Sequence, residues 1–229
     1  VRDTIQPRIK DGKIIIDELG MSEEEIKGIK KIYIIACGSA YHVGVTGKNV
    51  IEELARIPVE VDLASEFRYR NPIFEEGTMA IIVSQSGETA DSLAALREAK
   101  AHGVKVLGIV NVVGSSIARE ADNVMYTWAG PEIAVATTKA YSTQLAALYI
   151  LGMHFAYVRG QLNGEELAAY IEDLTALPDQ IQMILDDVEQ IQYYASKYVA
   201  AKSIFFIGRG IDYATALEGS LKLKEISYI

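Results

Sequence analysis

The 229 residues carry a formal net charge of −9, and half of them are hydrophobic, a balance that is typical of a folded globular protein. The acidic charge argues against diffuse attraction to nucleic acid or to an anionic membrane. No uncharged apolar run is long enough to cross a bilayer, so no membrane span is predicted. The single cysteine excludes an intrachain disulfide and fits a reducing, cytoplasmic setting.

The first 30 residues are polar apart from an apolar patch at Ile14 to Ile16, and we interpret residues 1–30 as an N-terminal linker that contains one helix. That helix is predicted between Met21 and Lys30, with Ser22 as its N-cap and Glu25 at the third helical position. The chain begins without an initiator methionine and stops inside an apolar pattern. We therefore expect it to be part of a longer protein.

Short apolar strands then alternate with helices, and we assign residues 31–200 to a first domain. Strands are predicted over residues 32–36, 59–63, 79–83, 104–110 and 124–127. Helices are predicted over residues 41–55, 88–102, 115–120, 138–159, 164–175 and 179–200. Pro178 is expected to open the last of these helices. This alternation, with strands that are apolar on both faces, predicts an α/β fold: a doubly wound parallel five-stranded sheet flanked by helices.

The pattern starts again near the end of the chain. Residues 203–207 are predicted to form a strand, which is followed by Gly208-Arg209-Gly210 and a helix from about residue 213. This succession echoes the first strand of the sheet and its turn. We therefore interpret residues 201–229 as the beginning of a second, similar unit that is truncated.

Two predicted turns carry polar groups at the carboxyl ends of strands, where open parallel sheets bind ligands. One spans residues 37–40. The other, residues 84–89, holds three hydroxyls and opens a helix whose free N–H groups favour an anion. Its Gly87 lets the backbone approach a ligand, and the turn contains no Lys or Arg. A small phosphate monoester suits it, with Glu88 pointing away, although a simple capped turn with Ser and Thr as N-caps explains the same residues.

Other chemistry is sparse. We interpret Cys37 as a small buried residue at a strand end, because a thiolate needs a neighbouring cation or base. Three scattered histidines and one cysteine form no metal site, and neither a metal nor a cofactor is predicted. Near the end of the chain, Lys222 lies within one helical turn of Glu218 and of Glu225. This stripe is either an exposed row of ion pairs or a carboxylate base held near a cation.

Five blocks of this sequence, which cover essentially the whole chain, resemble the glutamine–fructose-6-phosphate aminotransferase family in the family's own order. The blocks span Ala36–His42, Ala64–Arg70, Ser84–Asp91, Val135–Ala140 and Leu221–Ile229. The pattern Ser-x-Ser-Gly-x-Thr alone indicates only a sugar isomerase (SIS) domain. The blocks Ser-Glu-Phe-Arg-Tyr-Arg and Leu-Lys-Leu-Lys-Glu-Ile-Ser-Tyr-Ile make the narrower assignment specific.

The resemblance implies that fructose 6-phosphate and glutamine-derived ammonia become glucosamine 6-phosphate, with the ammonia supplied by an N-terminal glutaminase domain in the full-length protein. It also implies a homodimer. By motif position, the residues that hold the phosphate are Ser84, Gln85, Ser86 and Thr89. Those that line the sugar are Cys37, Gly38, Ser39, Val135 and Thr137. The proton transfer between the first two sugar carbons falls to Glu225, with Lys222 beside it.

The sequence also departs from the family. The family's first turn often reads Cys-Gly-Thr-Ser, whereas here Ala40 lacks one hydroxyl that would reach the phosphate. The glutaminase cysteine, the ring-opening histidine and the imine-forming lysine have no counterpart here, so this chain alone is expected to be inactive. Two other interpretations stay open: a non-catalytic SIS module that senses a phosphosugar, and a stand-alone phosphosugar isomerase. The lack of a basic helix-turn-helix segment weighs against the first, and the incomplete second unit against the second.

Overall fold

The computed structural model describes all residues from 1 to 229, and its centre is a five-stranded sheet. The strand order is β4-β3-β5-β6-β7, and every neighbouring pair is parallel. The strands span Lys31–Ala36 (β3), Val59–Leu63 (β4), Thr78–Ser84 (β5), Lys105–Val110 (β6) and Asn123–Tyr126 (β7). The predicted doubly wound parallel sheet is confirmed, and each strand agrees with its predicted range to within one residue at either end.

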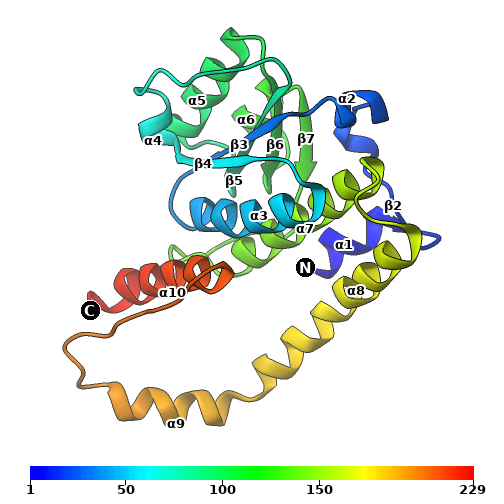
Figure 1. The fold of residues 1–229 in the computed structure, drawn as a ribbon. Helices are drawn as coiled ribbons and strands as arrows, with labels where there is room; N and C mark the ends of the chain where they lie inside the picture. Colours follow the sequence, from blue (N-terminus) through cyan, green and yellow to red (C-terminus); the bar gives the residue numbers. More distant parts are fainter.

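Helices cover both faces of this sheet (Figure 1). One face carries two long helices that also pack on each other, α3 (Ser39–Ala55) and α7 (Lys139–Val158). The other face carries three shorter helices, α4 (Ala64–Phe67), α5 (Ala90–Ala101) and α6 (Ser116–Glu120). None of the helices combines the length and the apolar character needed to cross a membrane.

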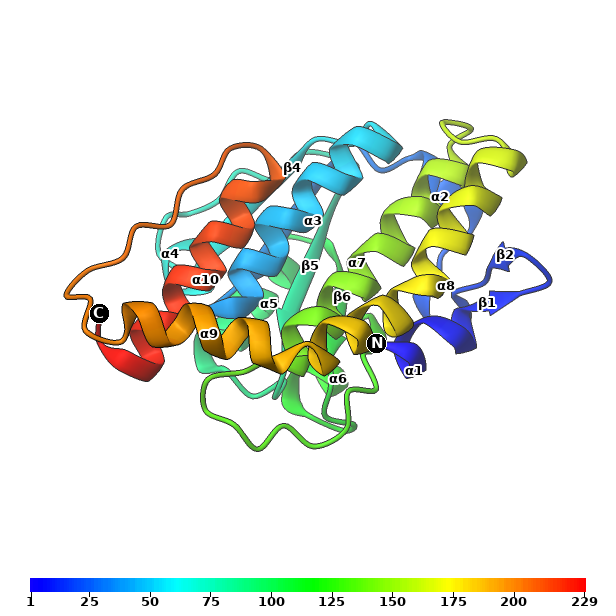
Figure 2. The same cartoon turned by 90° about the horizontal axis from the view of Figure 1, so that it is seen from below.

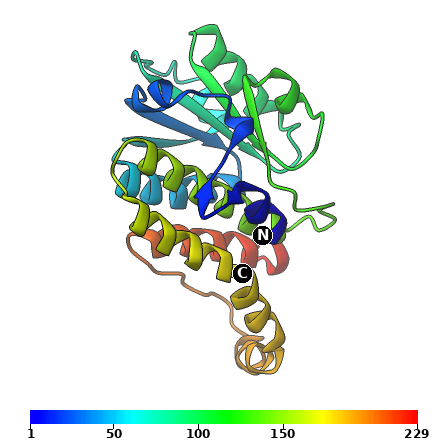
Figure 3. The same cartoon turned by 90° about the vertical axis from the view of Figure 1, so that its right-hand side faces the viewer.

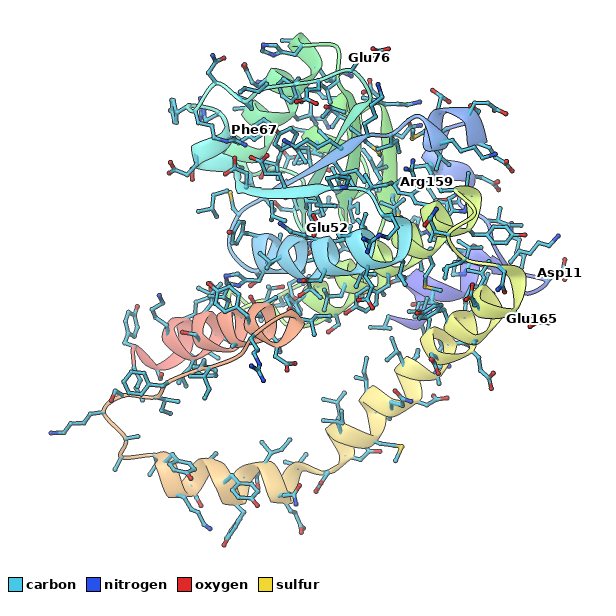
Figure 4. The ribbon with its side chains drawn as sticks, in the orientation of Figure 1. Asp11, Glu52, Phe67, Glu76, Arg159 and Glu165 are labelled. Atoms are coloured by element: carbon cyan, nitrogen blue, oxygen red, sulfur yellow. The ribbon has the colours of Figure 1, made fainter.

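The two faces of β3 show why the strands are apolar throughout. Ile32 and Ile34 belong to the core on the α3 and α7 side, whereas Tyr33 and Ile35 belong to the core on the α4 and α5 side. The ring of Phe67, labelled in Figure 4, meets that of Tyr33 edge to face with centroids 5.5 Å apart. Because both faces are covered by helices, successive strand residues are all buried.

The N-terminal segment is folded onto the domain. Its elements are α1 (Arg2–Ile5), a 3-10 turn (Gln6–Arg8), the hairpin β1 (Ile9–Lys10) and β2 (Lys13–Ile14), a second 3-10 turn (Asp17–Leu19) and α2 (Glu23–Lys27). Buried Ile5, Ile14 and Ile26 join the core beneath α7. Arg159, at the end of α7, donates hydrogen bonds to the carbonyls of Ile26 and Ala55 at 3.2 Å, which fixes α2 beside α3 (Figure 4).

The first helix after α7 begins as predicted, but it ends later than predicted, and the next helix begins later than predicted. The structure has α8 at Gly164–Asp186 and α9 at Val188–Tyr198, so the prediction that Pro178 opens a helix is wrong. Pro178 lies inside α8, which continues to Asp186. A proline removes one backbone hydrogen bond, but α8 continues past it; the part of the helix before Pro178 packs on the core through Leu174 and Leu177, whereas the part after it is largely exposed. Figure 3 shows α9 standing away from the sheet.

The strand predicted at residues 203–207 is absent, because no other strand of the chain lies beside it to pair with. The helix that follows is present as α10 (Ile211–Ser227), which lies alongside α3 (Figure 2). Gly210, the N-cap of α10, has φ 60° and ψ −133°, and Gly38, the N-cap of α3, has φ 57° and ψ −133°. This match supports the predicted similarity between the turn before α3 and the turn before α10. The assignment of residues 201–229 to a second unit stays a prediction.

Ser22 caps α2 as predicted, and Glu25 completes the capping box. One oxygen of Glu25 accepts a hydrogen bond from the backbone of Ser22 at 2.8 Å, and the other accepts one from Lys105 of β6, also at 2.8 Å. The Lys105 contact and the backbone of Ser22 lower the pKa of Glu25 from 4.5 to about 2. This carboxylate therefore ties α2 to the sheet.

The stability that Glu25 supplies is expected to depend on pH. Since the folded chain binds this proton less readily than the unfolded chain, the contribution is complete above pH 4.5 and is lost as the pH falls toward about 2. The melting temperature of Glu25→Gln should therefore lie below that of the wild type at neutral pH, and the gap should narrow between about pH 5 and pH 3. Thermal unfolding followed by circular dichroism measures it. Glu24→Gln, which removes a carboxylate without an ion pair from the same turn, should show no such trend.

Candidate functional site

A pocket of about 220 Å³ lies where β3 and β5 end. The chain passes from β3 outward to β4 and then returns to the other side of β3 as β5, so the pocket sits at the point where the strand order reverses. Its wall consists of Cys37, Ser39, Ala40, Val83, Ser84, Gln85, Ser86, Thr89, Val135, Thr137, Ala140, Gln144, Lys222 and Glu225. The structure thus brings together every predicted site residue except Gly38, whose backbone caps α3.

The turn after β5 directs hydroxyl groups into the pocket. Ser84 is buried, and its Oγ accepts a hydrogen bond from the backbone N–H of Gly87 at 3.1 Å. Thr89 is the N-cap residue of α5, but its side chain forms no capping hydrogen bond and lies 3.3 Å from Ser84 Oγ instead. A simple capped turn therefore does not account for Thr89. The turn leaves hydroxyls and the first N–H groups of α5 beside the pocket, where an anion is favoured.

Gly87 and Glu88 set the shape of this turn. Gly87 has φ +66°, a left-handed conformation, and a Cβ there would meet Ser115 Oγ at 2.1 Å. Glu88 turns out of the pocket as expected, and its carboxylate accepts a hydrogen bond from the backbone of Ser116 at 2.8 Å. Hydrogen bonds from Ser116 hold the pKa of Glu88 below its ordinary value. The acidic side chain is thereby kept on α6 and away from the pocket.

The turn after β3 forms the facing wall. Gly38 has φ +57°, which lets the chain turn sharply from β3 into α3. Cys37 is half-buried and lines the pocket, so the prediction of a buried side chain is only partly right. Its Sγ lies 4.0 Å from Ser92 Oγ. Ala40 contributes a methyl group where the family's common serine would contribute a hydroxyl.

A loop between β7 and α7 closes one side of the pocket through Val135 and Thr137. Glu132 organises this loop, because its carboxylate accepts hydrogen bonds from Thr137 Oγ1 at 3.1 Å and from the backbone N–H of Ala134 at 3.3 Å. Partial burial acts to raise the pKa of Glu132, but the hydrogen bonds from Thr137 and from the backbone lower it below its ordinary value. Val135 is fully exposed on the rim.

The last wall comes from α10, far away in the sequence. Lys222 Nζ lies 2.5 Å from Glu225 Oε2 and 3.7 Å from Glu218 Oε1. Both Lys222 and Glu225 line the pocket, and the Lys222 side chain is only 21 % exposed. The Glu225 side chain is 35 % exposed, so the stripe lies at the edge of the pocket and is partly open to solvent. A carboxylate and an ammonium group stand beside the hydroxyl-rich turn.

Gln144 lines the pocket but was not identified from the sequence. It lies in the middle of α7, is 2 % exposed, and reaches the pocket together with Ala140. Its signal was a polar side chain within a helix that is otherwise largely apolar. A buried amide offers both a hydrogen-bond donor and an acceptor, which suits contact with a sugar hydroxyl.

The electrostatics of the pocket are simple. Lys222 and Glu225 are its charged side chains, and hydroxyl and amide groups supply the remaining polarity. The arrangement can bind an ester dianion through dipoles at one end and move a proton with a carboxylate at the other.

Comparisons with known proteins agree with this geometry. The family model for the SIS domain matches residues 25–153. The chain is 57% identical to the "Glutamine--fructose-6-phosphate aminotransferase [isomerizing]" of Caldanaerobacter subterraneus and 59% identical to that of Clostridium tetani. Each alignment covers 100% of this chain but only 38% of the relative, so the chain spans well under half the length of these proteins.

Solved structures give the same result. The C-terminal domain of glucosamine-fructose-6-phosphate aminotransferase from Francisella tularensis is similar with a TM-score of 0.94 and 40% identity, over 100% of this chain and 64% of that one. A putative phosphosugar isomerase from Clostridium difficile has a TM-score of 0.80 and 26% identity, over 88% of this chain and 58% of that one. The predicted resemblance is therefore confirmed.

Gly87→Ala tests how tightly the turn is packed. The substitution is expected to lower the free energy of unfolding by about 2–4 kcal/mol, because a left-handed alanine is strained and its methyl group displaces Ser115. Gly103→Ala is the matched control: Gly103 has φ +74° but nothing within 4 Å of the added methyl group. Urea denaturation should show a larger loss for Gly87→Ala, and equal losses would mean that the turn is loosely packed.

Proposed function

We infer from these matches, which show that the chain belongs to the SIS domain family, that its pocket binds fructose 6-phosphate as the isomerase part of a glutamine–fructose-6-phosphate aminotransferase. One observation carries the proposal. The hydroxyl-rich turn of residues 84–89 and the pair of Lys222 and Glu225 share one pocket, although more than 130 residues separate them.

The turn after β5 is proposed to hold the phosphate. Ser84, Ser86 and Thr89 offer hydroxyls, Gln85 an amide, and α5 its first N–H groups. These dipoles favour a dianion without placing a second fixed charge beside the reacting carbons. Binding the ester group in this way orients the carbonyl end of the sugar toward α10, which converts remote affinity into alignment.

Glu225 is proposed to transfer the proton. Its carboxylate takes a proton from the first sugar carbon, and the electron pair forms the carbon–carbon double bond of an enediol-type intermediate. The same carboxylate returns the proton to the second carbon, while the hydroxyl proton of the first carbon passes to the oxygen of the second. Lys222, 2.5 Å away, holds the carboxylate in place and stabilises negative charge on the neighbouring oxygen. Cys37, Ser39, Val135 and Thr137 form the walls around the sugar, and the Gly38 backbone shapes the turn.

The remaining parts of the proposal concern the whole protein. This chain spans 38% of the length of its relatives, which is consistent with an N-terminal glutaminase domain that supplies ammonia. With that ammonia, the whole protein is proposed to convert fructose 6-phosphate to glucosamine 6-phosphate. We propose a homodimer in the cytoplasm. The Lys222–Glu225 pair inside the pocket favours this enzymatic role over a module that only senses a phosphosugar, which needs no general base.

Binding of the sugar phosphate is the first test. In isothermal titration calorimetry, full-length protein should release or absorb heat with fructose 6-phosphate and with glucosamine 6-phosphate, and both should raise its melting temperature. Ser86→Ala should weaken binding by about tenfold, because it removes a hydrogen bond to a charged group. Ser196→Ala, which removes a hydroxyl from α9, is the control. Heat with a nucleotide but with neither sugar phosphate would overturn the proposal.

Proton transfer is the second test. Glu225→Gln keeps the shape of the side chain but removes the base, so it should lower the rate of sugar isomerisation by about a hundredfold or more while leaving sugar phosphate affinity nearly unchanged. Stopped isomerisation assays and calorimetry on the same preparations measure the two quantities. Glu172→Gln, on the exposed face of α8, should change neither. Unchanged turnover in Glu225→Gln would mean that the ion pairs of Glu218, Lys222 and Glu225 on α10 have only a structural role.

A further inference from the structure

A histidine and a carboxylate meet behind the pocket, at the contact between α3 and α10. His42 Nδ1 lies 2.8 Å from Glu218 Oε2, and the two side chains are only 13 % and 9 % exposed. Neither residue lines the pocket. A buried charge without a partner is costly, so this pair requires an explanation.

The geometry continues from this pair into the pocket. The second oxygen of Glu218, Oε1, is buried without a hydrogen-bond partner, and it faces Lys222 Nζ at 3.7 Å. Lys222 in turn contacts Glu225 at 2.5 Å. His42, Glu218, Lys222 and Glu225 thus form one row that leads from α3 to the proposed base.

Lys222 lies between the carboxylates of Glu218 and Glu225. Its Nζ is 3.7 Å from Glu218 Oε1 but 2.5 Å from Glu225 Oε2, so it is held mainly by Glu225. Glu218 is already satisfied at one oxygen by His42, which donates from Nδ1 to the ionised carboxylate. Without that hydrogen bond, the buried Glu218 would need another partner, and the ammonium group of Lys222 is the nearest. Drawing Lys222 toward Glu218 would loosen its contact with Glu225.

We propose that His42 is a positioning residue for the reaction. Because His42 binds Glu218, Lys222 remains in contact with Glu225, and this contact fixes the position of the proton-transferring carboxylate. This inference rests on the proposed role of Glu225. His42 acts through two intervening side chains and does not itself touch the sugar.

The surroundings of Glu218 contain no further basic partner that competes with His42. Its carboxylate faces Lys222 of α10 and His42 of α3. The hydroxyl of Tyr141 in α7 lies close enough to interact electrostatically with it. Burial raises the pKa of Tyr141, and the negative charge of Glu218 acts in the same direction. Tyr141 therefore stays neutral, and the charge of Glu218 is balanced from α3 and α10.

Two substitutions of His42 in full-length protein separate positioning from packing. His42→Leu keeps the bulk but removes the donor, and it should lower kcat for sugar isomerisation by about tenfold to a hundredfold with KM changed less than about twofold. His42→Asn keeps an N–H group near the place of Nδ1 and should restore most of kcat. His102→Leu, which breaks a surface histidine–glutamate pair on α5, is the control and should leave both constants unchanged.

The outcomes distinguish this inference from the proposed function. Wild-type kcat in His42→Leu, or equal losses in both variants, would overturn the inference while leaving the role of Glu225 intact. A double-mutant cycle with Glu218→Gln, followed by urea denaturation, tests the pair independently of any activity. Coupling between the two positions is expected, and strictly additive losses of stability would refute it even if the wild type failed to isomerise the sugar.

Discussion

The packing of α10 against α3 determines what this pocket can do. The sheet and its strand-end turns supply hydroxyls, amides and N–H groups, whereas the charged side chains of the pocket arrive with α10. Without α10, the pocket would keep hydroxyl and N–H groups that can bind an anion, but it would lose Glu225, the proposed proton-transferring group. The hydrogen bond between His42 and Glu218 lies within this contact. In the proposed function, binding and proton transfer thus come from two parts of the chain, which meet where α10 packs on α3.

The position of the hydroxyl-rich turn at the pocket could be predicted because its signals are local. An apolar strand, a turn of Ser, Gly and Thr, and the start of a helix follow one another in the sequence, and parallel strands place such turns at one edge. The position of Glu225 followed only from resemblance, since helical spacing shows which residues share a face but not what lies opposite. His42 and Glu218 are separated by 176 positions, so no local pattern connects them.

The errors have physical causes of the same kind. Residues 203–207 are apolar enough for a strand, but a strand exists only where another strand pairs with it, and none does here. Proline is common at the start of a helix, yet Pro178 lies inside α8, where the helix continues with one backbone hydrogen bond fewer. The N-terminal segment looked polar, and its few isoleucines nevertheless anchor it to the core.

The turn after β5 holds no fixed positive charge, and this chain carries a formal net charge of −9. In the proposed function, an approaching phosphate ester therefore meets the repulsion of an acidic chain before the hydroxyls and N–H groups of this turn can bind it. Such a site forgoes electrostatic steering, so capture is slower than a basic funnel would allow. In exchange, recognition rests on short-range geometry, and a dianionic product is not retained by a strong field when it leaves.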